Sequence, residues 1–150
     1  MDVLKVILLI LHVALAATAF GVSLGPSGSL KRARVVGKGA LEAAAEDFRR
    51  RDGFAAIAGL FVLASGLGLV FANGGFKVVG PQYHAALGLM LIVILFGYLF
   101  MRPTAKGLVA SAKTGDDPAT DKGIRRAAMG AGIMQLLWLV ILVLMFWHRF

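Results

Sequence analysis

The sequence predicts an all-α integral membrane protein, a single transmembrane domain built as an antiparallel four-helix bundle. Hydrophobic residues make up 59% of the chain and charged residues 16%, which is more apolar and less charged than a soluble domain. The apolar residues gather in runs long enough to cross a bilayer, which takes about 20 residues. The formal charge is +8, but the basic residues flank these runs, so we expect the lipid bilayer and no nucleic acid as partner.

Four runs qualify as membrane spans, and turn residues mark their ends. The first could pass for a signal peptide, but it continues to Leu24, which is long enough to span, and ends at Gly25-Pro26. The second ends at Asn73-Gly74-Gly75. The third opens at Pro81, a favoured first-turn residue, and stops before Arg102-Pro103. The predicted spans are about 3–24, 53–72, 81–101 and 127–147.

The charge of the connections predicts the orientation. Basic residues crowd the first and third connections, whereas the second holds only Lys77. The positive-inside rule therefore places the first and third connections in the cytoplasm. We expect a multi-pass protein of a bacterial-type inner (plasma) membrane, with the N-terminus and the C-terminus both extracytoplasmic.

The two basic connections give different expectations. Between Gly39 and Arg51, one helical face collects Leu41, Ala45 and Phe48. This pattern predicts a short amphipathic helix that lies on the inner leaflet or extends the second span; a solvated connector is the alternative. The connection 104–122 is polar and interrupted by Gly and Pro, so we expect it to be irregular. Asp121 or Thr120 is the expected cap of a short helical lead-in to the fourth span.

Helix faces buried in membranes favour small residues and a few polar ones. In the first span, one stripe carries His12, Ala16, Ala19 and Ser23. In the third span, we expect the inward stripe to be His84, Gly88, Leu91, Leu95 and Tyr98. These stripes predict a bundle interior that contains both histidines.

An ionisable side chain inside a span predicts a functional site. His12 lies about nine residues, or roughly 13 Å, into the first span, near mid-membrane. His84 lies about one turn, or roughly 5 Å, into the third. Imidazole can ligate haem iron, copper or zinc, relay protons, or only bond a neighbouring helix. Because the two depths differ, one shared haem requires helix tilt; otherwise each histidine serves a separate centre, or one is no ligand.

Several chemistries are missing from the sequence. Cysteine is absent, which excludes disulfides and thiol catalysis. No span contains an acidic residue, although a transporter driven by protons or sodium usually needs one. There is no phosphate-binding glycine loop, no Ser/His/Asp set and no carboxylate pair.

The chain carries sparse motifs of a known group. They are Leu11-His12-Val13, Arg50-Arg51-Asp52-Gly53, Leu63-Ala64-Ser65-Gly66-Leu67 and Tyr83-His84-Ala85-Ala86-Leu87. Over roughly the first hundred residues, this pattern resembles the small four-span proteins of the HemJ-type protoporphyrinogen oxidase and CopD-like group. The resemblance implies haem association for the HemJ type and copper handling for the CopD type. His12 and His84 match the family's histidines, but Ala86 stands where the HemJ-type motif has lysine, which weakens protoporphyrinogen oxidation and leaves haem binding open.

The leading prediction is a haem-binding membrane protein of electron transfer or redox chemistry, with a b-type haem ligated by His12 and His84. A copper-handling membrane protein with these histidines as metal ligands is the alternative, and a non-catalytic membrane subunit is a third. The pairs Gly21-x-x-x-Gly25 and Ala128-x-x-x-Gly132 predict a homo-oligomer, a dimer. The sequence names no redox partner or quinone and leaves open whether the protein is an enzyme. Without a cofactor, we expect His12 to bond Gln135 or Ser65.

Overall fold

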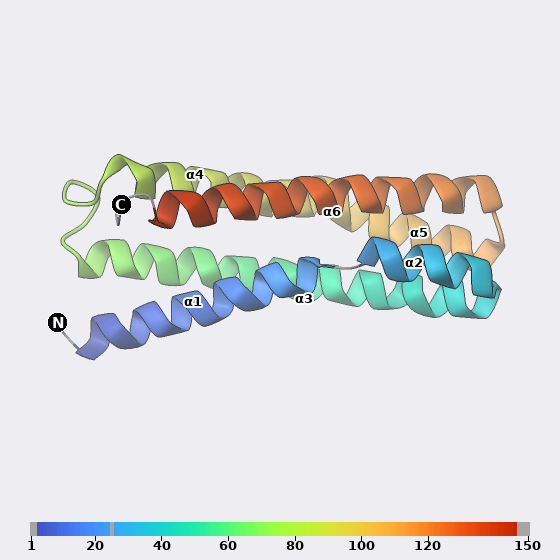
Figure 1. Ribbon diagram of the computed structural model, residues 1–150, viewed down its shortest axis with the longest axis horizontal. Helices are drawn as coiled ribbons and strands as arrows, with labels where there is room; N and C mark the ends of the chain where they lie inside the picture. Colours follow the sequence, from blue (N-terminus) through green and yellow to red (C-terminus); the bar gives the residue numbers. More distant parts are fainter. Residues whose placement is uncertain (1–2, 25, 147–150) are drawn as a thin grey trace.

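The computed structural model describes residues 3–24 and 26–146, and this part of the chain is helical and contains no strand. Four continuous or kinked rods are long and apolar enough to cross a membrane, which confirms the predicted all-α bundle (Figure 1). The elements are α1 (Val3–Ser23), α2 (Pro26–Val36), α3 (Lys38–Ala72), α4 (Pro81–Phe96), the π turn η1 (Gly97–Met101), α5 (Arg102–Thr114) and α6 (Asp117–Phe146).

The rods are longer than a bilayer is thick. α3 has 35 residues, about 52 Å of helix, against a hydrocarbon core of about 30 Å. We call residues 26–52 and 102–126 the charged half, and residues 3–24, 53–101 and 127–146 the apolar half. All lysines and arginines except Lys5, Lys77 and Arg149 belong to the charged half. In the apolar half many large side chains such as Leu60, Leu95 and Leu136 are exposed on the outside, which suits lipid contact.

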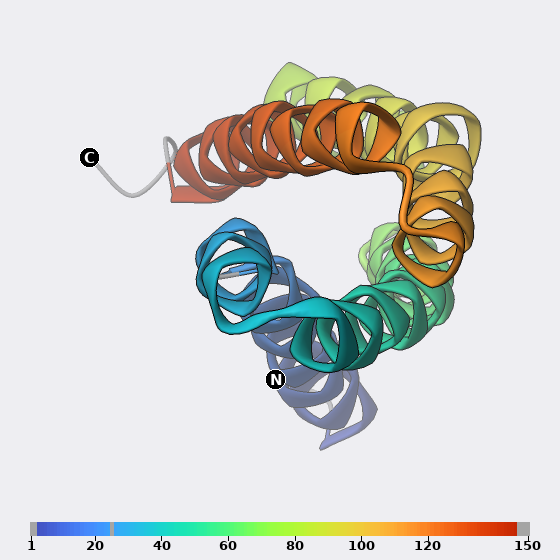
Figure 2. The same cartoon turned by 90° about the vertical axis from the view of Figure 1, so that its right-hand side faces the viewer.

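Each half has its own core. In the charged half, Leu30, Leu41, Phe48, Leu108 and Ile124 join α2, α3, α5 and α6. In the apolar half, side chains from α1, α3, α4 and α6 meet, among them Ala19, Val62, Ala86, Met90 and Trp138. Viewed along the long axis, the helices follow one another around the bundle (Figure 2).

The amphipathic helix predicted in the first connection is confirmed. Leu41, Ala45 and Phe48 are buried, and the helix runs without a break into the second span as α3. The preceding helix α2 was not predicted. It is short and polar, so its sequence shows little periodicity, and it is held by one fully buried side chain, Leu30.

The expectation of an irregular connection at 104–122 is wrong, because the helix of the third span continues beyond Arg102-Pro103. The chain passes through the π turn η1 into α5 without leaving helical geometry, and Pro103 follows just after the π turn. Ala105, Leu108 and Ala112 recur at helical spacing and are buried. Burial of this face outweighs the polar composition of the segment.

Glycines reverse the chain at the far end of the charged half. Gly37, alone between α2 and α3, has φ 133° and ψ 178°, a region almost closed to other residues. Gly115 ends α5 in the left-handed conformation. The next residue, Asp116, caps α6, because its Oδ1 accepts a hydrogen bond from the Ala119 N–H at 3.0 Å. The expected caps Asp121 and Thr120 are therefore wrong: both lie within α6, which begins at Asp117.

The predicted inward stripe of the third span is also wrong. His84 and Gly88 are exposed, and Leu95 and Tyr98 are 60% and 63% exposed. The packed face of α4 is instead formed by Ala86, Met90 and Val93. In the first span the prediction is better, because Ala19 is buried and His12 and Ala16 are half-buried. Trp147, the predicted end of the fourth span, lies outside the described residues.

Candidate functional site

His12 lies at the contact between α1 and α3. Its Nδ1 is 2.9 Å from Ser65 Oγ, and Ser65 Oγ donates to the Val62 carbonyl at 3.0 Å. Serine has one hydroxyl proton. Because that proton is donated to the Val62 carbonyl, Ser65 Oγ can only accept from His12, and Nδ1 carries the imidazole proton. In the neutral imidazole this leaves Nε2 unprotonated and able to act as a ligand or acceptor.

The local sequence of α3 makes room for the imidazole. Gly66 lies directly beneath the ring: a Cβ at this position would be 3.2 Å from His12 Cε1. His12 and Ser65 also lie at the same depth in their spans, because His12 is 12 residues before Leu24 and Ser65 is 12 residues after Gly53. At 1.5 Å per residue, both are about 18 Å from the charged half. The α1–α3 register therefore presents the only hydroxyl of the Leu63–Leu67 segment to His12.

His84 lies near the opposite side of the bundle in a different setting. It is on the exposed face of α4, and its Nδ1 is 3.3 Å from the carbonyl of Gly80, the cap residue of the same helix. Its ring centroid is 5.7 Å from that of Phe76, which in turn meets Phe71 edge-on. These contacts join the start of α4 to the loop 73–80 and give His84 local structural contacts.

The structure does not bring the two predicted ligands together. α1 packs mainly on α3, whereas α4 packs on α6 and α3, and Figures 1 and 2 show α1 and α4 on different sides of the bundle. His12 near mid-span and His84 in the first turn of α4 also keep the difference in membrane depth that the sequence predicts. Within residues 3–24 and 26–146, no three His, Cys, Asp or Glu side chains gather as a metal site.

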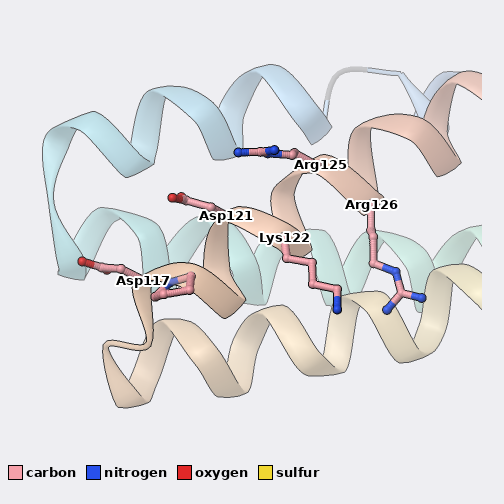
Figure 3. Close-up of a pocket in the computed structure, with 6 residues that line it drawn as sticks. Asp117, Asp121, Lys122, Arg125 and Arg126 are labelled. Atoms are coloured by element: carbon pink, nitrogen blue, oxygen red, sulfur yellow. The ribbon is translucent and has the colours of Figure 1, made fainter.

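A second polar site lies in the charged half, between α2 and α6. Arg34 forms ion pairs with Asp117 at 2.8 Å and Asp121 at 3.0 Å. Beside them, Lys31, Ile124 and Arg125 complete the lining of a groove of about 250 Å³. Figure 3 shows Asp121 and Arg125 on the α2 side of α6, while Lys122 and Arg126 point toward α5. Arg126 lies over the Phe100 ring, 5.7 Å from its centroid.

The sequence did not reveal this second site, because its residues come from segments more than 80 positions apart. The charge pattern gave one signal: acidic residues 117 and 121 are one helical turn apart and can face one cation. Arg34 could not be recognised as that cation, because it lies on α2, a helix that the sequence did not predict.

Arg50 and Arg51 could bind haem propionates only if a haem lay at the charged half. Arg51 Nε is 2.7 Å from Asp47, and Arg50 Nε is 3.9 Å from Glu46, both within α3. His12 lies about 18 Å farther along the bundle. Arg50 and Arg51 therefore belong to the charged surface and not to the His12 site.

The fold and these two sites define a polytopic helical membrane protein with one imidazole in its apolar half and a charged helical extension. Comparison with known protein families, characterised proteins and solved structures finds no match to this chain. The assignment of function therefore depends on the residues themselves.

Proposed function

We propose that this protein is a haem-binding integral membrane protein of electron transfer or redox chemistry, with His12 as an axial ligand. The observation that carries the proposal is the hydrogen bond between His12 Nδ1 and Ser65 Oγ. Histidines that ligate metals nearly always donate their second ring N–H to a carboxylate, a backbone carbonyl or water, which fixes the tautomer and the ring orientation. Here the Ser65 hydroxyl takes the place of that acceptor. His12 is already arranged in this way.

The residues around His12 fit one axial imidazole. A bound haem supplies reversible one-electron chemistry at its iron. In the proposal, Nε2 of His12 holds the iron, Ser65 orients the ring, and Gly66 allows the ring to lie close to α3. The apolar half keeps water away from the site, which tunes the reduction potential through burial.

His84 remains the proposed second ligand, but its position on the exposed face of α4 favours a separate centre. Copper handling has less support, because copper sites usually combine several imidazole or sulfur ligands, and His12 and His84 lie on α1 and α4, which pack mainly on different neighbours.

We also propose that the charged half lies in the cytoplasm of a bacterial-type inner membrane and that both termini are extracytoplasmic. The charge asymmetry between the two ends of the bundle supports this orientation. α1 begins and α6 ends at the same end of the bundle (Figure 1), as an even number of spans requires.

The test is the absorption spectrum of the full chain, purified in mild detergent after expression with sufficient haem. We expect a Soret band that is retained in His84→Ala, since His84 is remote from His12. Iron and copper are measured on the same sample. A protein with copper and no iron, or with no Soret band, would reject the proposal.

A further inference from the structure

We propose that the groove between α2 and α6 binds the headgroup phosphate of an anionic phospholipid, with Lys31 and Arg125 as the two cations. The groove belongs to the charged half, far from His12, so the inference does not depend on the proposed function. Lys31 and Arg125 lie on facing helices, both are exposed, and both line the groove. Neither forms an ion pair among the contacts of the described residues.

The charges of the groove are divided between structure and binding. Arg34 forms ion pairs with both Asp117 and Asp121, and this three-residue network joins α2 to α6. Within residues 3–24 and 26–146, Lys31 and Arg125 form no ion pair with an acidic residue. Lys122 and Arg126 add positive charge on the adjoining surface of α6. A phosphate diester between Lys31 and Arg125 would share its single negative charge between the two cations through charge-assisted hydrogen bonds and leave the Arg34 network intact.

The height of this pair matches the headgroup layer. Arg125 lies two residues before Ala127, where the apolar run of α6 begins, and Lys31 lies in the second turn of α2, just past the end of the first span. Arg34 is about one turn farther from the apolar half and meets Asp117 and Asp121 there. The unpaired cations are therefore at the boundary of the two halves, and the paired residues lie beyond it.

An apolar stripe continues from Arg125 into the apolar half. At spacings of three and four residues, α6 exposes Met129, Gly132, Leu136 and Val140. Figures 1 and 2 show that α1 leans away from α6 toward Val3, so this face of α6 is not covered by α1. A phospholipid whose phosphate is held at Arg125 would place its acyl chains along this stripe. A soluble anion would have no use for these apolar contacts, which is why we assign a lipid.

The test is native mass spectrometry of the full chain in mild detergent, with phosphatidylglycerol and phosphatidylcholine of identical acyl chains. We expect the wild type to retain phosphatidylglycerol preferentially. Lys31→Gln combined with Arg125→Gln should weaken that binding at least about tenfold, since charge-assisted hydrogen bonds are lost. The matched control is Lys106→Gln with Lys113→Gln, which removes the same charge from α5 and should keep the preference.

Four outcomes would overturn the inference. The first is a wild type without preference for the anionic lipid, which needs no variant. The second is an equal loss in the control pair, which would indicate unspecific attraction. The third is displacement of the lipid by inorganic phosphate at similar concentration, which would indicate a soluble anion. The fourth is a wild-type dimer that dissociates in the Lys31→Gln and Arg125→Gln double variant, which would indicate that a second copy of the chain, and not a lipid, covers the α6 stripe around Gly132. Circular dichroism confirms that the double variant folds, as expected for two exposed residues.

Discussion

At the scale of single residues, the sequence predicted two alternative hydrogen-bond partners for His12, and the structure shows which one it contacts. Ser65 and Gln135 were the two candidate partners at its depth. The structure selects Ser65, because α1 packs mainly on α3 and only slightly on α6. Which neighbour a helix has is a property of the whole bundle, so a single span cannot reveal it.

The close approach of His12 to Gly66 gives a residue-scale prediction. In Gly66→Ala, the new Cβ would lie 3.2 Å from the imidazole, and we expect overpacking to cost about 1–3 kcal/mol. Gly68→Ala is the matched control, since its Cβ would meet only Leu8 Cδ2 at 4.0 Å. Thermal unfolding in detergent measures both. Equal melting temperatures would mean that the ring does not pack against α3 as described.

At the scale of elements, the apolar parts of the four spans could be predicted because their length and composition are demanded by the bilayer. The amphipathic face of Leu41, Ala45 and Phe48 was also visible. The sequence did not predict α2, and it predicted an irregular connection in place of α5. Glycine, proline and charged residues obscure the buried faces of both helices. The face of α4 was misassigned because His84 and small residues suggested an interior stripe, whereas Ala86, Met90 and Val93 are packed.

The one-residue turn between α2 and α3 provides an element-scale prediction. Gly37 has φ 133°, so Gly37→Ala should destabilise the charged half by about 1–3 kcal/mol through backbone strain. Gly39→Ala, two residues later inside α3 with open space at its Cβ, should stabilise it by about 0.5–1 kcal/mol. Hydrogen exchange of the α2–α3 segment reports both changes. Similar effects of the two substitutions would contradict this turn geometry.

At the scale of the whole molecule, the structure is a rod with two chemically distinct halves. α3 and α6 continue from the apolar half into the charged half, and α4 continues through η1 into α5; together with α2 they form a separate core in the charged half. This continuity couples the halves mechanically. It also places the groove of Lys31 and Arg125 at the boundary, a position that neither half would define alone.

The orientation of the rod gives a whole-molecule prediction. Because the chain has no cysteine, single cysteines can report sidedness without background. Lys113→Cys should be labelled by an impermeant thiol reagent only after cells are opened, and Lys77→Cys should be labelled in cells whose outer envelope is permeable to the reagent. The reverse pattern would place the charged half outside, against the positive-inside rule.

The central claim is that His12 ligates a haem, and His12→Phe measured by spectrum and thermal melt on one sample tests it most directly. If haem is bound, the Soret band should be lost or shifted. The variant should also lose more stability than one interhelical hydrogen bond contributes, about 0.6 kcal/mol, because a ligand that binds the native state stabilises it. An unchanged spectrum together with an unchanged melt would contradict every role assigned to this residue.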